Sequence, residues 1–107
     1  MLTYNKLVRD KIPEIIKKDG KSITTTILSD EAYRDSLYKK LLEEVEELIA
    51  ADSSSEIIEE AADLLEVIEG LVKLNGSSIQ EVEQVRANKK DQRGGFDKRI
   101  FLQEVSE

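Results

Sequence analysis

Hydrophobic positions recur with a helical period through the middle of the chain. In IIEEAADLLEVIEGLVKL, residues 57–74, Leu64, Val67 and Leu71 form one stripe at about 100° per residue. The stretch LYKKLLEEVEELIAA, residues 37–51, has the same period. We therefore predict two long amphipathic helices, over about 30–51 and 54–74, separated by the break DSSS.

Start and stop signals extend this prediction along the chain. Ser29 or Asp30 can cap the first long helix, and Ser53 has the S-x-x-E spacing of a capping box before the second. The second helix should stop at Asn75–Gly76. Ser78 repeats the capping-box spacing, which predicts a third helix over about 79–91.

The two ends of the chain have a different pattern. Pro13 suits the first turn of a short helix that runs towards Lys18. Residues 22–29 are rich in β-branched side chains, and FDKRIFLQEV, residues 96–105, alternates loosely. These two segments could pair as a small β ribbon. We therefore predict a single all-α domain over residues 1–107, an antiparallel helical bundle with a small ribbon from its ends.

Composition narrows the chemistry. The 107 residues carry a net charge of −7 with a pI of about 4.7, which argues against a partner that is a nucleic-acid polymer. The chain has neither Cys nor His, so thiolate chemistry and the commonest general base are excluded. Carboxylates without His favour hard cations such as Mg²⁺ or Mn²⁺. No apolar run approaches a membrane span, and MLTYNKLVRDK lacks a signal-peptide core, so we expect a cytoplasmic protein without membrane association.

One carboxylate lies on the side of a helix that should be buried. On a helical wheel Glu60 falls inside the apolar stripe and Asp63 lies beside it. On the preceding helix Glu44 lies at the border of the apolar arc, and Glu47 is its i+3 neighbour. If the two helices pack antiparallel, these four acids converge. Their mutual repulsion would be severe unless divalent ions lay between them, so the pattern predicts a metal site.

Two other interpretations compete with a metal site. Glu60 could be an edge residue whose carboxylate reaches solvent or pairs with Lys40 or Lys73. The chain would then be a non-catalytic helical interaction module whose apolar stripe binds a partner. A ferritin-like di-iron site is a third option, but its Glu-x-x-His motif needs a His that this chain lacks.

The acidic motifs match a known family. EEVEE followed by EAAD resembles the E-E-x-x-E and E-x-x-D pair of the MazG-like all-α nucleoside triphosphate pyrophosphohydrolases. The stretch from KKLLEEVEELIAAD to NGSSIQEV is similar to the related phosphoribosyl-ATP pyrophosphohydrolases of histidine biosynthesis. The resemblance covers about residues 37–96, and YNKLVRDKIPEII and RGGF resemble a single-domain MazG-like subgroup.

The resemblance implies Mg²⁺-dependent cleavage between the α and β phosphates, giving a nucleoside monophosphate and pyrophosphate. It implies a house-cleaning enzyme for (d)NTPs, with phosphoribosyl-ATP as the alternative substrate. It also implies a homodimer or homotetramer, because helices of this family pack across subunits. Base selectivity cannot be read from the five aromatic residues.

Residue roles carry over by position. The implied metal ligands are Glu44, Glu47, Glu60 and Asp63, with Glu43 or Glu56 to orient water or an outer ligand. Lys89 and Arg93, one helical turn apart, would face the phosphates. The N-terminal NKLVRDK, with Lys6, Arg9 and Lys11, would close over the substrate or remain a solvated segment packed by Leu7 and Val8. Lys40 and Asn88 are further candidate substrate contacts.

Overall fold

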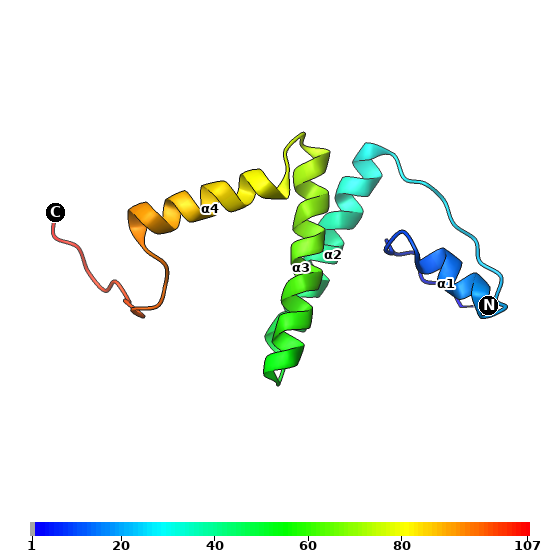
Figure 1. Cartoon of the computed structure of the whole chain (residues 1–107), viewed down its shortest axis with the longest axis horizontal. Coiled ribbons are helices and arrows are strands. Elements are labelled where there is room, and N and C mark those ends of the chain that lie inside the picture. Colours follow the sequence, from blue (N-terminus) through cyan, green and yellow to red (C-terminus); the bar gives the residue numbers. More distant parts are fainter. Residues whose placement is uncertain (1) are drawn as a thin grey trace.

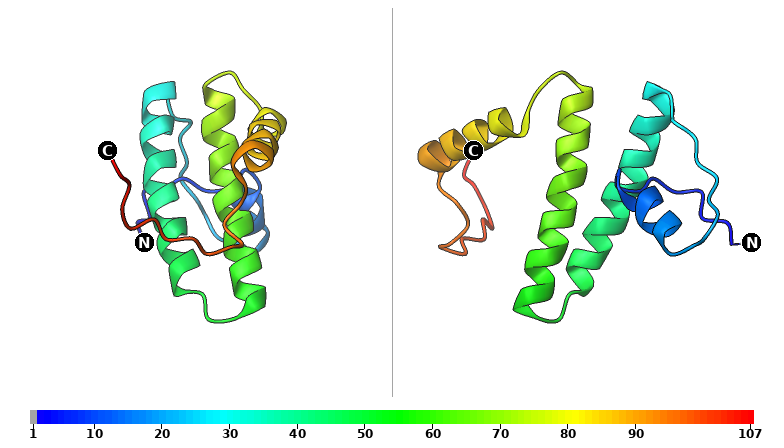
Figure 2. Two further views of the ribbon diagram at one scale, coloured as in Figure 1. Left: turned by 90° about the vertical axis from the view of Figure 1, so that its left-hand side faces the viewer. Right: turned by 45° about the vertical axis from the view of Figure 1, so that its right-hand side comes forward.

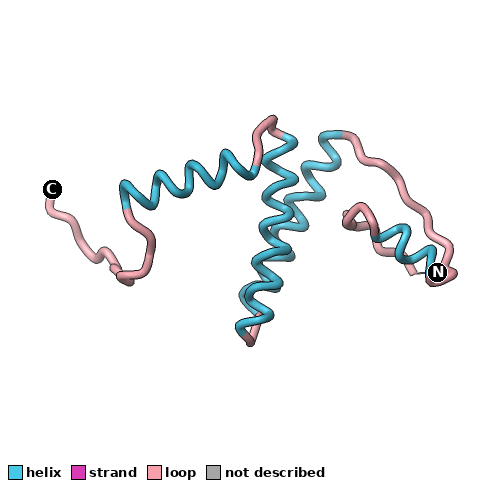
Figure 3. Tube along the Cα trace, viewed as in Figure 1, coloured by secondary structure: helices cyan, strands magenta, loops and turns pink. Residues whose placement is uncertain are grey.

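Four helices make up the regular structure of residues 2–107. The computed structural model describes residues 2–107, and its elements are α1 (Ile12–Lys18), α2 (Asp30–Ala50), α3 (Ser54–Leu74) and α4 (Ile79–Arg93). Within residues 2–107 there is no β-strand, and the rest of the trace is loop (Figures 1 and 3). The predicted all-α class is confirmed, and the three long helices begin and end within two residues of the predicted bounds.

Serine side chains fix where the three long helices begin. The Oγ atoms of Ser29, Ser53 and Ser78 each accept a hydrogen bond of 3.2 Å from a backbone N–H three residues later. Each bond satisfies one of the donors that a helix start leaves without a partner. The predicted capping residues therefore set the phase of each helix, and with it the direction in which its acids point.

A glycine ends α3. Gly76 has φ of +82°, which a residue without a Cβ adopts without strain. Its N–H donates to the Lys73 carbonyl, and the Ser77 N–H donates to the Val72 carbonyl, both at 3.0 Å. These two bonds are the pair expected of a Schellman motif, which stops the helix and turns the chain towards α4.

The helices α2 and α3 form an antiparallel hairpin at the centre of the molecule (Figures 1 and 2). Its buried apolar core consists of Leu37, 4% exposed, and Val67, 7% exposed. A Cβ added at Gly70 would lie 3.1 Å from both the Leu37 Cδ2 and the Tyr33 Oη atoms. A glycine at this point lets the two helices approach more closely than a larger residue would.

The rest of the chain spreads away from this hairpin. The N-terminal segment with α1 lies on one side and α4 extends on the other (Figure 1). The radius of gyration is 18.5 Å, against about 13 Å for a compact domain of this length. The accessible surface is 9895 Å², against about 6,000 Å² for a folded monomer of this mass. A single copy thus leaves much of its apolar surface uncovered.

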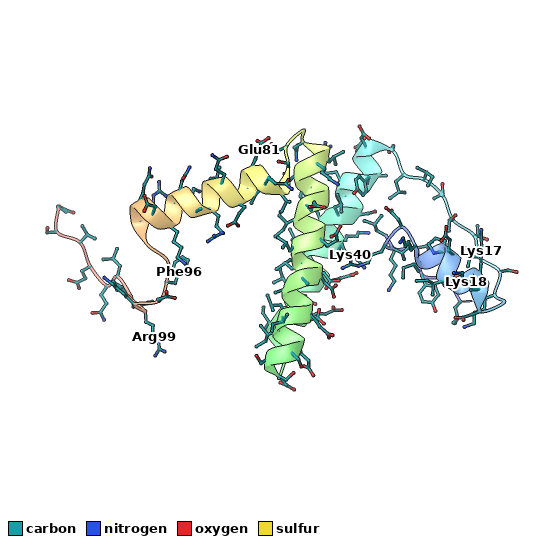
Figure 4. All side chains as sticks on the ribbon, in the orientation of Figure 1. Lys17, Lys18, Lys40, Glu81, Phe96 and Arg99 are labelled. Carbon is teal, nitrogen blue, oxygen red and sulfur yellow. The ribbon has the colours of Figure 1, made fainter. Side chains whose placement is uncertain are left out.

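The predicted β ribbon is wrong for the single chain. Residues 22–29 and 96–105 run as loop, and they lie on opposite sides of the hairpin (Figures 1 and 3). Phe96 and Arg99 mark the C-terminal segment in Figure 4. The β-branched residues of 22–29 and the alternation of 96–105 give these segments a strand propensity, but a strand needs a partner strand to satisfy its backbone groups. Among the described residues, no helix is long and apolar enough to cross a membrane.

Candidate functional site

Three carboxylates converge on the α2–α3 hairpin. Glu44 and Glu47 come from α2, and Glu60 comes from α3. Each offers an oxygen atom, and the three oxygens lie within 4.8 Å of one another. The i, i+3 spacing puts the α2 pair on one face, and the antiparallel turn brings Glu60 opposite to it. Three of the four acids expected to converge therefore lie together, and we call these three residues the acidic cluster.

Part of the acidic cluster is removed from water. Glu44 is only 7% exposed. The Oε2 atoms of Glu44 and Glu60 are buried, and neither has a hydrogen-bond partner among the described residues. A buried carboxylate oxygen without a partner costs free energy, unless the group takes up a proton or binds a cation.

Electrostatics within the acidic cluster disfavour ionisation. Burial raises the pKa of Glu60 to about 7, and the neighbouring Glu47 carboxyl and the charges of Asp63 and Glu44 add to the effect. Burial also raises the pKa of Glu44, together with the charge of Glu47 beside it. A nearby cation would reverse both effects, because it would stabilise the charged carboxylates.

These properties fit a divalent cation. The donor atoms are all carboxylate oxygens, the ligands that hard cations prefer. The two unpartnered buried oxygens and the raised pKa values each describe a site with an excess of negative charge. The acidic cluster could therefore hold a divalent metal ion.

Asp63 lies close to the acidic cluster but has a different partner. The Arg9 Nη2 atom donates a hydrogen bond of 2.8 Å to the Asp63 Oδ1 atom. No oxygen of Asp63 joins the three that lie within 4.8 Å of one another. The sequence had suggested separate roles for Arg9 and Asp63. Their pairing could not be read from it, because 54 positions separate them and the N-terminal segment has no periodic pattern.

The lysines predicted near the site have varied surroundings. The charge of Lys40, one turn before Glu44, lowers the Glu44 pKa and so opposes part of its rise. In Figure 4, Lys40 lies on the side of the hairpin that faces the N-terminal segment. Lys6 places its Nζ atom 5.9 Å from the centre of its neighbour Tyr4's ring. Lys73, a suggested partner of Glu60, pairs instead with Glu69 at 3.7 Å, so that alternative is not supported.

The two further acids suggested by the sequence lie outside the acidic cluster. Glu43 is exposed on α2. The Glu56 Oε2 atom accepts a hydrogen bond of 2.9 Å from the Asp52 backbone N–H, while the Glu56 N–H donates to the Ser53 side chain. In the single chain Glu56 therefore completes the capping of α3.

The basic residues of α4 are not brought to the acidic cluster of their own chain. Asn88, Lys89 and Arg93 are exposed on α4. This helix leaves the hairpin at a wide angle and contacts α3 only near their junction (Figures 1 and 2). The predicted i, i+4 pair is on a helix, but its phosphate-binding role needs an arrangement that one copy does not provide.

Comparisons with known proteins show the family of this chain. A family model described as phosphoribosyl-ATP pyrophosphohydrolase matches residues 5–90. An uncharacterized protein of Mycolicibacterium smegmatis is 47% identical over 53 residues, which are 50% of this chain and 54% of the relative. The chain thus spans about half the length of that relative. No solved structure matches significantly. Since the family model covers both carboxylate motifs and most of the chain, the protein belongs to the phosphoribosyl-ATP pyrophosphohydrolase family.

Proposed function

We propose that this protein is a Mg²⁺-dependent nucleotide pyrophosphohydrolase that cleaves the bond between the α and β phosphates of nucleoside triphosphates. The products are a nucleoside monophosphate and pyrophosphate. The acidic cluster supports the proposal most directly, because it combines three converging carboxylates with two buried, unpartnered oxygens in a chain of a pyrophosphohydrolase family.

In this proposal Glu44, Glu47 and Glu60 hold Mg²⁺, or Mn²⁺ in its place, and Asp63 joins them. The ion would polarise a phosphate oxygen and lower the pKa of a water molecule. The protein would supply position and charge. The capped helices α2 and α3 hold the carboxylates in a fixed register, and the exposed Glu43 lies one residue from Glu44, where it could orient water.

Basic residues would bind the phosphates. The charge of Lys40 lowers the pKa of Glu44 in the acidic cluster. The N-terminal segment, with Lys6 and Arg9, approaches the acidic cluster from one side through the Arg9–Asp63 pair. We propose that Asn88, Lys89 and Arg93 serve the acidic cluster of a second copy. A lysine and an arginine one turn apart on α4 would then offer a point charge and a planar fork to the leaving pyrophosphate.

The proposed assembly is a homodimer or homotetramer. Leu42, Ile49 and Ile58 of the hairpin are each at least two-thirds exposed, as is Phe101 in the tail. The accessible surface exceeds that of a compact monomer by thousands of Å². Obligate dimer interfaces bury a comparable area, about 2,000–5,000 Å². Light scattering coupled to gel filtration should give at least twice the 12.1 kDa chain mass. A monomeric mass would contradict the assembly.

The test of the activity is a substrate panel. The protein is incubated with canonical and modified NTPs, dNTPs and phosphoribosyl-ATP, with and without Mg²⁺, and pyrophosphate release is measured. We expect pyrophosphate only with Mg²⁺ present. Inorganic phosphate as the sole product would mean a different bond is cut. Turnover of phosphoribosyl-ATP alone would favour the second candidate, phosphoribosyl-ATP pyrophosphohydrolase, which the description of the matching family model supports.

A further inference from the structure

The N-terminal segment is joined to the hairpin by one charged contact. Between residues 2–29 and the rest of the described chain, the ion pair of Arg9 with Asp63 is the one formed. Both side chains keep considerable exposure, 56% for Arg9 and 42% for Asp63. An ion pair in such a solvated position is weak and readily exchanged.

Asp63 is bonded to Arg9 and lies outside the acidic cluster. The Asp63 charge is close enough to raise the pKa values of Glu44 and Glu60. Its carboxylate nevertheless offers no oxygen to the group within 4.8 Å, and its Oδ1 atom is bound to the Arg9 guanidinium at 2.8 Å. To add an oxygen to that group, the Asp63 carboxylate would have to move, and the bond from Arg9 to its Oδ1 atom opposes that movement. A guanidinium and a divalent ion would also repel each other across one carboxylate.

We propose that Arg9 is a resident cation that competes with the metal ion for Asp63, so that metal binding releases the N-terminal segment from the hairpin. This inference rests on the proposed metal site. When no metal is bound, the guanidinium neutralises Asp63. When a divalent ion enters, Asp63 joins its ligands, and the freed guanidinium can pair with a phosphate oxygen of the incoming nucleotide. Arg9 thus first positions Asp63, and the Arg9 guanidinium then contacts the substrate.

The affinity for Mn²⁺ shows whether Arg9 weakens or strengthens metal binding. Free Mn²⁺ is measured by electron paramagnetic resonance in the wild type, in Arg9→Gln and in Lys11→Gln. The Lys11 variant is a matched control, because it removes the same charge from the same segment, and among residues 2–107 Lys11 forms no ion pair. We expect Arg9→Gln to bind Mn²⁺ roughly two- to five-fold more tightly than Lys11→Gln, the range for an exposed pair.

Release of the segment gives a second readout that does not depend on activity. Because the chain has no cysteine, Thr3→Cys provides a single site for a fluorescent label. Addition of Mg²⁺ should lower the fluorescence anisotropy of the label in the otherwise wild-type chain. In a chain that also carries Arg9→Gln, the anisotropy should be low from the start and should not respond to Mg²⁺.

The outcomes separate this inference from the proposed function. If the wild type binds Mn²⁺ and Arg9→Gln binds it equally or more weakly than Lys11→Gln, Arg9 supports the ion instead of competing with it, and the inference is overturned. Unchanged anisotropy on Mg²⁺ binding would also overturn it. If neither the wild type nor the variants bind Mn²⁺, the proposed metal site itself fails, and the inference fails with it.

Discussion

The α2–α3 hairpin and the helix α4 are built from similar local signals but have different surroundings. Both begin at a serine cap. The hairpin buries Leu37, Val67 and the Glu44 carboxylate against its own helices. No residue of α4 is buried. The core of the hairpin is therefore formed within one chain, whereas α4 contacts the rest of its chain only near its junction with α3.

The same contrast appears in two carboxylates. On the hairpin, burial and neighbouring acids raise the pKa of Glu60 to about 7. On α4, the Glu83 carboxylate accepts two hydrogen bonds from Arg86, of 2.6 and 2.8 Å, which lower its pKa. A carboxylate with its own cation is stable as it stands. A carboxylate held among other acids is stabilised only by a proton or a cation that comes from outside the chain.

Removal of core volume should show the largest difference in stability. Leu37→Ala leaves a cavity opposite Gly70, between α2 and α3, and we expect it to lower the free energy of unfolding by about 2–5 kcal/mol. In a single copy Val85→Ala on α4, at 52% exposure, should cost less than about 0.5 kcal/mol, and packing of α4 on the proposed second copy would raise that cost. Urea denaturation followed by circular dichroism measures both. A large cost at Val85 would show that α4 is buried against another copy.

Removal of one carboxylate should show the largest difference in activity. Glu60→Gln deletes a proposed ligand with little change in volume, so we expect Mg²⁺-dependent pyrophosphate release to fall on the order of 100-fold or more. The matched control is Glu83→Gln on α4, which should leave kcat/KM within about two-fold. Equal losses in the two variants would contradict a specific role for the acidic cluster.

The raised Glu60 pKa predicts an unusual pH dependence for the metal-free protein. Its folded pKa of about 7 exceeds the ordinary value of 4.5, so the folded state binds more protons between these values. The associated stability is fully present below pH 4.5 and is lost as pH rises through about 7. In EDTA the melting temperature should therefore fall from pH 5 to pH 8.

Two comparisons check that this fall of the melting temperature with pH comes from the acidic cluster. Glu60→Gln should flatten it, because the titrating group is gone. Addition of Mg²⁺ should raise the melting temperature most at pH 8, where the carboxylates are ionised. A melting temperature that rises with pH in EDTA would show that the acidic cluster does not hold protons in the folded state.

The smallest expected effect concerns the caps. Ser53→Ala and Ser78→Ala each remove one side-chain hydrogen bond at a helix start. At Ser53 we expect a loss of about 1 kcal/mol in the free energy of unfolding, because α3 unfolds together with α2. At Ser78 the loss should be smaller and should be seen mainly as faster amide exchange in the first turn of α4. Similar losses at the two sites would mean that α4 unfolds with the hairpin.

The helices could be predicted from sequence because their signals are local. Ser29, Ser53 and Ser78 act within three residues, and Asn75–Gly76 acts within five. The β ribbon was wrong because β-branched side chains give only a propensity, and pairing depends on a partner that this chain does not bring near. The direction of α4 after Gly76 was equally out of reach, since few contacts fix it.

The acidic cluster was predictable for the same reason, but only in part. Helical wheels for residues 37–51 and 57–74 placed Glu44, Glu47 and Glu60 together, and the structure does so. Asp63 belongs to the same predicted group, yet in the structure it pairs with Arg9. That contact depends on the path of a loop segment with no repeating pattern, so no periodicity argument could have found it.

The short turn between α2 and α3 has a consequence for how this protein can change in evolution. Glu44 lies eight residues before Asp52 and Glu60 lies eight residues after it. The two helix segments on either side of the turn at residues 51–53 therefore set the register between the two carboxylates. One residue gained or lost inside α2 after Glu47, or inside α3 before Glu60, would rotate one carboxylate by about 100° relative to the others. Insertions beyond Asn75 or before Ser29 would leave that register untouched. Descendants of this chain can therefore vary in length at the open end of the hairpin and should keep its closed end constant.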